Sequence, residues 1–359
     1  MSWPDHGAMP HQLRTKLNVS SQEEVLDFSV NTNPLGPPAE LLENLKDCFQ
    51  YLTYYPDPEQ LELLQMISYF TGTEPEQVLA GNGGAELIFT TARLFAGKRV
   101  LLIEPAFKEY DKALQSVSAD IMRHIVYEEN NWSWKLDDIG DKLIQCDAIW
   151  LCNPNNPSGI SLSQEVLEEL IDYCALHQII VVIDEAFYDF QLHPADLLPY
   201  IRNNVPLLLI RSVTKMYAVP ALRAGYMLGP DFLISELKEL LPAWNVNIFA
   251  EYALKYAVSE HNHVYKTAEF VAKERNRFLQ KLKELYMVPF PSSVNYFLLR
   301  HQDFSDMSAL LAYLARSEVH ARHTYHFPGL SGRYIRIAVK TKQENDQLAE
   351  ILQGWCERC

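Results

Sequence analysis

The sequence predicts an α/β protein with a mainly parallel central sheet flanked by helices, followed by a smaller α+β domain. Short runs such as Ala148–Cys152 and 179–183 are apolar at every position, which is typical of parallel strands covered on both faces. Residues at helical spacing separate these runs. From about residue 248 the pattern changes to a long polar-faced helical stretch and then to shorter units.

Length and composition narrow the class of protein. A single core rarely accommodates all of a 359-residue chain, so one long domain or two domains of unequal size are expected. Hydrophobic residues make up 48% and charged residues 21%, as in ordinary globular proteins. The net charge of −15 repels nucleic acid and anionic membranes. No apolar run could span a membrane and the first residues do not resemble a signal peptide, so the sequence predicts a cytoplasmic protein.

Two helices are expected before the first strand. Apolar residues recur at helical spacing over 41–49 and again over 61–67. A glycine-rich turn at 81–84 then opens a third helix, which runs through Leu94. The apolar run at 100–103 is the first strand that the pattern indicates.

The alternation of helices and strands continues to residue 210. Further elements are expected as a helix at 106–117, strands at 121–126 and 148–152, a helix at 163–177, and strands at 179–183 and 207–210. The C-terminal pattern predicts a helical stretch at 249–285, a strand at 295–300, a helix near 305–316, a strand at 334–339 and a last helix from 342. These patterns place a large domain at 36–247 and a small one at 248–359.

Ligands of an open parallel sheet bind beyond the carboxyl ends of its strands, so the residues there are candidates for chemistry. The turn at 81–84 opens a helix, and free amides at a helix start bind phosphate. A plain tight turn is the alternative interpretation. Glu86 stands where a dinucleotide fingerprint needs glycine, and no P-loop lysine follows, which excludes both motifs.

Two more segments follow buried strands. The loop at 153–159 is rich in proline and asparagine, which favours a rigid support that aims a side chain over a purely structural turn. Asp184 ends the run at 179–183, where a carboxylate is costly unless it pairs with a cation or with donors. Its expected role is to hold a positive centre. Mg²⁺ in an ATPase is the alternative, and the missing P-loop argues against it.

Lys215 follows the apolar run at 207–210. The side-chain amine of a lysine that follows such a strand and lies near other cations should have a depressed pKa and be nucleophilic. These properties suit imine formation with a carbonyl. Ser212, Thr214 and Arg223 could bind a phosphate. The alternative interpretation of Lys215 is an ordinary surface lysine.

Together these features meet the needs of pyridoxal phosphate, and the chain resembles the fold-type I pyridoxal-phosphate family, close to the class I/II aminotransferases. The resemblance rests on N-P-x-N-P-x-G at 153–159, D-E-A at 184–186, S-x-[ST]-K at 212–215 and Arg223 eight residues further on. It covers nearly the whole chain. It also implies that residues 1–35 pack at the active site with the small domain.

The resemblance implies a role for each site residue. Lys215 is the Schiff-base lysine, Asp184 pairs with the pyridinium nitrogen and Asn156 donates to the ring 3-oxygen. Phe107 stacks on the ring. The phosphate contacts fall to Gly83, Gly84, Ala85, Ser212, Thr214 and Arg223. Tyr55 resembles the tyrosine that reaches the phosphate of the neighbouring subunit, which implies a homodimer.

Within the family, the chain is similar to the threonine-phosphate decarboxylases and the histidinol-phosphate aminotransferases. Arg336 matches the arginine that clamps the substrate carboxylate, and Arg322 matches one that contacts a substrate phosphate. His6 and Asn31 match residues that help to hold this phosphate in the decarboxylases, although a lone N-terminal histidine is usually solvent-exposed. Phe187 replaces the tyrosine usual in the aminotransferases, as it does in the decarboxylases.

The expected reaction is therefore decarboxylation of L-threonine O-3-phosphate to (R)-1-amino-2-propanol O-2-phosphate and CO₂ in cobalamin biosynthesis. The alternative is histidinol-phosphate aminotransfer to 2-oxoglutarate, because the cofactor-binding residues do not distinguish the two. A non-catalytic regulator would need an added DNA-binding domain, for which about 36 residues before the α/β domain are too few. No metal is expected: Cys356 and Cys359 have C-x-x-C spacing, but no second pair or histidine accompanies them.

Overall fold

The large sheet contains seven strands in the computed structural model, which describes residues 3–19 and 25–357. The strands are β2 Val78–Gly81, β3 Arg99–Glu104, β4 Asp120–Ile125, β5 Ala148–Cys152, β6 Ile180–Asp184, β7 Leu207–Ser212 and β8 Gly225–Leu228. Their order is β2-β8-β7-β6-β5-β3-β4. From β7 to β4 all neighbours are parallel, while β8 runs antiparallel to both β2 and β7. The predicted α/β fold with a mainly parallel sheet is confirmed.

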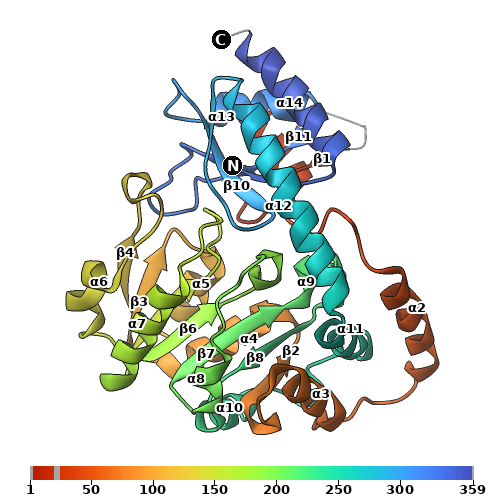
Figure 1. The fold of residues 1–359 in the computed structure, drawn as a ribbon, viewed down its shortest axis with the longest axis vertical. Helices are drawn as coiled ribbons and strands as arrows, with labels where there is room; N and C mark the ends of the chain where they lie inside the picture. Colours follow the sequence, from red (N-terminus) through yellow and green to blue (C-terminus); the bar gives the residue numbers. More distant parts are fainter. Residues whose placement is uncertain (1–2, 20–24, 358–359) are drawn as a thin grey trace.

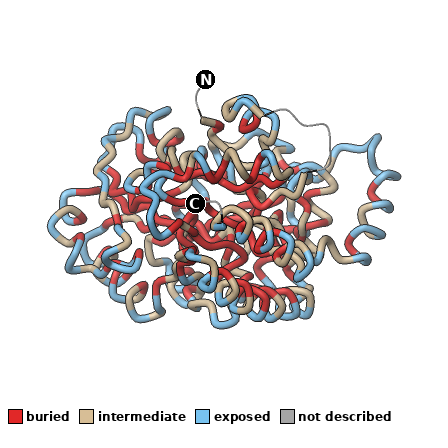
Figure 2. The backbone as a smooth tube through the Cα atoms, turned by 90° about the horizontal axis from the view of Figure 1, so that it is seen from above, coloured by how far each residue is buried: buried red, intermediate tan, exposed pale blue. Residues whose placement is uncertain are grey.

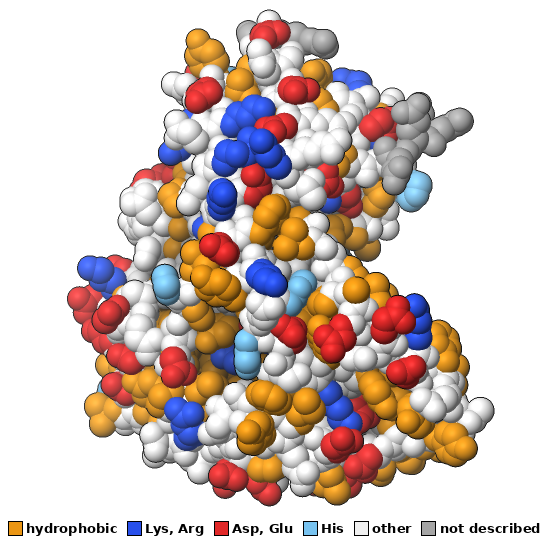
Figure 3. Space-filling view, turned by 45° about the vertical axis from the view of Figure 1, so that its right-hand side comes forward, with side chains coloured by type: hydrophobic (Ala, Val, Ile, Leu, Met, Phe, Trp, Pro, Cys, Tyr) orange, Lys and Arg blue, Asp and Glu red, His pale blue; other side chains and the backbone are white. Residues whose placement is uncertain are grey.

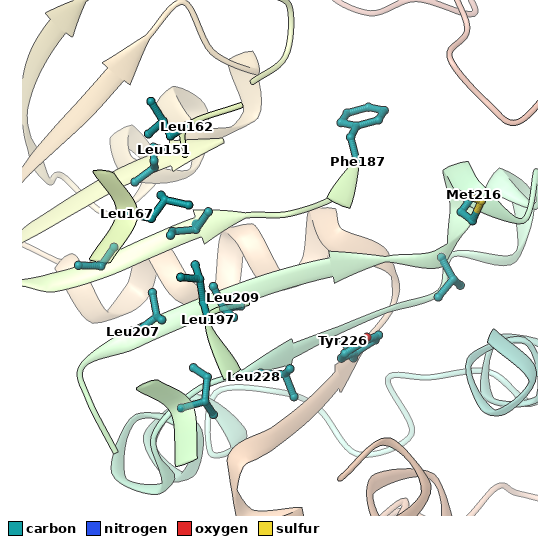
Figure 4. Close-up of a cluster of buried hydrophobic side chains, with 14 of the residues drawn as sticks. Leu151, Leu162, Leu167, Phe187, Leu197, Leu207, Leu209, Met216, Tyr226 and Leu228 are labelled. Carbon is teal, nitrogen blue, oxygen red and sulfur yellow. The ribbon is translucent and has the colours of Figure 1, made fainter. Parts of the chain in front are cut away.

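Helices cover both faces of this sheet (Figure 1). One face packs against α4 Gly83–Ala92, α5 Lys108–Ser116 and α10 Asp231–Lys238. The core on the other face includes α3 Leu61–Thr71, α6 Leu136–Leu143, α7 Gln164–Leu176, α8 Leu198–Arg202 and α11 Ile248–Ser259. Strand residues alternate between the two cores, because successive side chains of a strand point to opposite faces. Figure 4 shows the second core, in which Leu207, Leu209 and Leu228 lie on one side of the sheet.

The C-terminal elements form a second, smaller sheet with its own core. Its strands are β9 Met287–Pro289, β10 Tyr296–His301, β12 Arg322–His323 and β13 Ile335–Ala338, in the antiparallel order β12-β13-β10-β9. Three helices pack against it, namely α12 His261–Lys283, α13 Ser308–Arg316 and α14 Lys342–Cys356. In Figure 1, α12 runs from the level of the large sheet up to these elements.

The N-terminal segment joins this C-terminal part rather than the large sheet. After α1 Pro10–Leu17, the short strand β1 Leu26–Asp27 pairs in parallel with β11 Val319–His320. Arg14 on α1 donates from Nε to His320 Nε2 at 2.8 Å. The chain then passes to α2 Ala39–Asp47, which packs against α11. The domain boundaries at residues 36 and 248 stay predictions.

The structure differs from the expected elements in several places. Strands β2 and β8 are absent from the sequence prediction, and β2 precedes the run at 100–103 that was expected to be the first strand. Each has four residues including a glycine, which is too short for a recognisable period. The helix expected at 249–285 is two helices, because Glu260 leaves the helical conformation and its carboxylate caps His263 N at 2.9 Å. The sequence prediction also lacks the helices α1, α6, α8 and α10, the one-turn helix α9 Val213–Met216 and the short strands β1, β9, β11 and β12.

Buried residues are concentrated in the middle of the molecule and exposed ones at its periphery (Figure 2). Trp150, Tyr110 and Phe297 are among the largest side chains that are fully buried. None of the helices within residues 3–19 and 25–357 is long and apolar enough to cross a membrane.

Gly225 in β8 sets how closely this strand approaches the start of α4. A Cβ atom there would lie 2.9 Å from Gly84 N and 3.0 Å from Arg211 O, both backbone atoms. We expect Gly225→Ala to lower the free energy of unfolding by about 1–3 kcal/mol, since the core cannot accommodate the methyl group without a backbone shift. Urea unfolding of the two proteins measures the change.

Gly140→Ala is the matched control, because no atom lies within 4 Å of the Cβ position there and Gly140 is inside α6. It should raise stability by about 0.5–1 kcal/mol. An unfolding midpoint of Gly225→Ala equal to that of the native protein would contradict the packing argument.

Candidate active site

A cavity of about 570 Å³ lies at the carboxyl ends of β5, β6 and β7. Parallel strands present their carboxyl ends at one edge of a sheet, which explains why residues distant in sequence meet there. The predicted site residues that line it are His6, Asn31, Gly84, Ala85, Phe107, Asn156, Asp184, Ser212, Thr214, Lys215, Arg223, Arg322 and Arg336. Gly83 and Tyr55 do not line it.

One end of the cavity is built to bind an anion. Helix α4 begins at Gly83, and the first amides of a helix have no partner within it. The hydroxyl groups of Ser212 and Thr214 are 2.9 Å apart and line the same cavity as Arg223. Gly83 has φ +77, and a Cβ there would lie 2.5 Å from Arg223 Nη2, so only glycine lets the guanidinium approach the helix start. We call this end of the cavity, formed by the start of α4 with Ser212, Thr214 and Arg223, the phosphate cradle. Gly83 shapes the phosphate cradle although it does not itself line the cavity.

Lys215 extends from the short helix α9 Val213–Met216, which follows β7 directly. No acidic side chain within the described residues forms an ion pair with it. The pKa of Lys215 is lowered to about 8, mainly by burial and then by the nearby Arg336 and Arg223. A fraction of this amine is therefore neutral and nucleophilic near neutral pH.

Asp184 ends β6 and is 5% exposed. Its Oδ1 accepts a hydrogen bond from Ala186 N at 2.9 Å, and its Oδ2 accepts one from the Tyr110 hydroxyl at 2.6 Å. Burial raises the pKa of Asp184, while these two donors act in the opposite direction. The carboxylate is thus held at the cavity wall, where it can pair with a cationic group of a ligand.

Asn156 is oriented by Arg336, whose Nη1 donates to Asn156 Oδ1 at 2.7 Å. The amide oxygen is therefore occupied, and Nδ2 is the group left to donate to a ligand. Arg336 Nη2 donates to Ser29 O at 2.8 Å, and the guanidinium lies 5.1 Å from the ring centroid of Tyr296. One arginine thus connects the loop after β5 with the N-terminal segment.

Two arginines face the cavity from adjacent strands. Arg322 on β12 and Arg336 on β13 are direct partners in the antiparallel register, so their side chains point to the same face. Neither forms an ion pair with an acid among the described residues, and Arg322 instead donates to Pro4 O at 2.9 Å and to Asp5 O. Burial is the main cause that lowers the pKa of Arg322 to about 9 and that of Arg336 to about 10. Two buried like charges without a counter-ion indicate an anionic ligand.

The N-terminal segment contributes further residues to the cavity that Arg322 and Arg336 face. His6 lines the cavity and its Nε2 lies 3.1 Å from Glu109 Oε1, so His6 is not a freely exposed residue. Burial lowers its pKa. Asn31 is 4% exposed, and its Nδ2 finds no partner within the part of the chain that the structure describes. A buried donor without a partner at a cavity wall indicates a ligand that supplies one.

Aromatic rings form the apolar walls. Phe107 precedes α5 and lines the cavity, with its ring 5.8 Å from that of Tyr110. Phe187 also lines the cavity, packs edge-on against Tyr296 at 4.8 Å and supplies no hydroxyl. Figure 4 shows Phe187 beyond the carboxyl end of β6, apart from the leucine cluster.

Tyr55 lies outside the cavity. Its side chain is 83% exposed and its ring centroid lies 5.0 Å from that of Trp244. Its role across a subunit interface stays a prediction.

No role was predicted from the sequence for several cavity residues, of which Ser29, Glu109, Tyr110 and Cys152 carry polar groups. A signal was present for two of them. Tyr110 lies three residues after Phe107, one helical turn further on, and Cys152 is the last residue of a predicted strand. No cluster of three or more possible metal ligands is found in the ranges described, and Cys359 of the C-x-x-C pair lies outside the described residues.

The residues present fit pyridoxal phosphate. The helix start with Ser212, Thr214 and Arg223 suits its phosphate, the buried carboxylate of Asp184 suits its ring nitrogen, and Lys215 suits its aldehyde. The unpartnered Asn31 and the two arginines lie among the remaining cavity residues, which leaves them for a second anionic ligand.

Comparison with known proteins gives a consistent result. The family described as aminotransferase class I and II matches residues 23–352. The chain is 32% identical to the threonine-phosphate decarboxylase of Salmonella typhimurium over 354 residues, covering 97% of this chain and 96% of that protein. It is 29% identical over 361 residues to the adenosylcobalamin biosynthesis bifunctional protein CobDQ of Leptospira interrogans, covering 99% of this chain and 41% of that protein.

Among solved structures, the histidinol-phosphate aminotransferase of Clostridium acetobutylicum superimposes with a TM-score of 0.87 at 27% identity. The match covers 93% of this chain and all of that one.

The lowered pKa of Lys215 predicts how the apoprotein takes up its cofactor. The neutral amine attacks an aldehyde. Because the pKa of Lys215 is about 8, the neutral form predominates above that pH. The rate of capture of pyridoxal phosphate should therefore rise from pH 7 to pH 8 and level off above pH 9. Stopped-flow absorbance at several pH values measures this rate. A rate that keeps rising to pH 10.5 would show an ordinary lysine, and Lys215→Ala should give no covalent adduct after borohydride reduction.

Proposed function

This chain belongs to the aminotransferase class I and II family, and on that premise we propose that it decarboxylates L-threonine O-3-phosphate. The products would be (R)-1-amino-2-propanol O-2-phosphate and CO₂, in cobalamin biosynthesis. The cofactor of the enzyme is pyridoxal 5′-phosphate. Relatives named threonine-phosphate decarboxylase and CobDQ support a role in the synthesis of cobalamin.

The observation that carries this proposal is the pair of buried arginines without acidic partners. Arg322 and Arg336 lie opposite each other on adjacent strands and face one cavity, so they suit a substrate with two anionic groups. Threonine phosphate has a carboxylate and a phosphate. We assign the carboxylate to Arg336, which already orients Asn156, and the phosphate to Arg322 with His6 and Asn31.

The chemistry divides between the cofactor and the chain. When bound, pyridoxal phosphate withdraws electrons from the substrate Cα so that one of its bonds can break. Asp184 would hold the ring nitrogen in its protonated form, and Arg336 would hold the substrate carboxylate. Once the carboxylate has left as CO₂, Lys215 Nζ, in its protonated form, would deliver the proton that replaces it at Cα. No second substrate is required.

Histidinol-phosphate aminotransfer is the second candidate, because the solved enzyme of that name from Clostridium acetobutylicum shares the fold at a TM-score of 0.87 and 27% identity. The same arginines could hold the phosphate of histidinol phosphate or the carboxylates of glutamate. Phe187 favours the decarboxylase, since its ring offers no hydroxyl to the cofactor 3-oxygen. The two reactions differ in their need for a keto-acid acceptor.

We also propose that the enzyme is a homodimer in which Tyr55 reaches the phosphate cradle of the neighbouring subunit. Tyr55 and Trp244 form an exposed aromatic pair, which supports a contact with another surface. Figure 3 shows further hydrophobic side chains on the surface of the lower half of the molecule. The cytoplasmic location and the two domain boundaries stay predictions from the sequence.

The reaction is tested with the cofactor-loaded enzyme and phosphothreonine alone. We expect CO₂ and aminopropanol phosphate without any keto acid, measured as released gas and by mass spectrometry. Lys215→Ala should release neither product. Glutamate formation from histidinol phosphate and 2-oxoglutarate, with no CO₂ from phosphothreonine, would establish the aminotransferase instead.

Arg322→Ala tests the assignment of the substrate phosphate. Losing a charge-assisted contact costs about 1.5–3 kcal/mol, so KM for phosphothreonine should rise about 10- to 100-fold. Capture of the cofactor should be unchanged. Arg333→Ala, which removes a half-exposed arginine near Glu128, is the control and should leave KM as it is. If Arg322→Ala instead lost the cofactor, Arg322 would bind the phosphate of the cofactor and not that of the substrate, which would contradict the assignment.

A further inference from the structure

Tyr110 is a fully buried tyrosine that contacts Asp184 directly. It lies on α5, its exposed fraction is 0%, and its hydroxyl donates to Asp184 Oδ2 at 2.6 Å. It lines the cavity together with Phe107 and Cys152, and its role was not predicted from the sequence. This hydrogen bond joins α5, on one face of the large sheet, to the carboxyl end of the central strand β6.

The ring of Tyr110 has one orientation available. Trp150 stacks on it with ring centroids 5.6 Å apart and planes at 28°, and Phe107 meets it edge-on at 5.8 Å and 84°. Both neighbours are part of the buried core on this face, or pack against it. The hydroxyl is therefore aimed at Asp184 by packing, before any ligand binds.

The hydrogen bond has a fixed direction. Burial and the neighbouring Asp184 raise the pKa of Tyr110 well above its ordinary value, so the phenol stays protonated and donates. A donated hydrogen bond stabilises the ionised form of a carboxyl group. With Ala186 N on Oδ1 and Tyr110 on Oδ2, each oxygen of Asp184 is held by one donor and retains a further lone pair for a ligand.

We infer that Tyr110 is a positioning residue for the cofactor: its hydroxyl holds Asp184 as an oriented anion, and thereby sets how strongly the enzyme favours a protonated pyridine nitrogen. This inference rests on the proposed role of Asp184 in pairing with that nitrogen. Tyr110 itself acts through the carboxylate. The loop hydrogen bond alone, from Ala186 N, would leave the buried carboxylate with a single donor.

The test compares two ligands that differ only at the ring nitrogen. Apoprotein is titrated with pyridoxal phosphate and with its deaza analogue, in which carbon replaces that nitrogen, and the ratio of the two dissociation constants is the preference for a ring nitrogen. The native protein should prefer pyridoxal phosphate. Tyr110→Phe should reduce the preference about tenfold, the value of one hydrogen bond to a charged group, and leave affinity for the analogue unchanged.

Tyr217→Phe is the matched control. Tyr217 is also buried, its hydroxyl donates to Ala257 O at 2.8 Å and Glu260 O at 3.1 Å, and it does not line the cofactor cavity. Loss of this hydroxyl in Tyr217→Phe should leave the ratio of the two dissociation constants at the native value. Thermal unfolding of both variants confirms that they are folded, because phenylalanine keeps the packed ring.

The outcomes separate this inference from the proposed function. If the native protein prefers pyridoxal phosphate and Tyr110→Phe shows the same ratio of dissociation constants, Tyr110 does not act through Asp184. The inference is then overturned, while the role of Asp184 stands. Equal weakening of both ligands by Tyr110→Phe would show a purely structural role and would also overturn it. If the native protein does not distinguish the two ligands, the assignment of Asp184 fails together with the inference.

Discussion

Parallel pairing of β5, β6 and β7 is the constraint on which the rest of the site depends. In this register Cys152 lies opposite Asp184, and Asp184 lies opposite Ile210. The strands therefore end at one edge, and the chain that continues from β7 places Lys215 in the same cavity as the acid of β6. Because a slip of one residue would turn every side chain to the other face, the buried apolar strands specify both the core and the chemistry.

The cavity contains charges that the protein does not neutralise. Asp184, Arg322 and Arg336 are buried, and among residues 3–19 and 25–357 only neutral groups donate to the acid or accept from the arginines. Such groups reduce stability in the empty protein, and ligands of opposite charge offset that cost. The same feature that weakens the fold thus explains why a cationic ring and an anionic substrate bind here. Burial is also the main cause of the lowered pKa of Lys215, and the neighbouring cations Arg336 and Arg223 lower it further.

The substrate side of the cavity is assembled from the two ends of the chain. Strand β1 pairs with β11, Arg322 donates to Pro4 and Asp5, and Arg336 donates to Ser29. These contacts join the N-terminal segment to the small sheet, above strand ends that belong to the large sheet. The cofactor cradle is built differently, from segments that each follow a strand of the large sheet or open α4. Under the proposed function, the residues assigned to the substrate and those assigned to the cofactor therefore lie mainly on separate parts of the fold.

The sequence by itself determined the α/β fold and the residues at the strand ends, such as Asp184 and Lys215, because an apolar run and the polar residue that ends it are adjacent in the chain. The unpartnered amide of Asn31, the register that sets Arg322 against Arg336, and the bond from Tyr110 to Asp184 were decided only by the tertiary structure. Each of them joins segments far apart in sequence, and their meeting depends on how the sheets and helices pack, which no local pattern of residues contains.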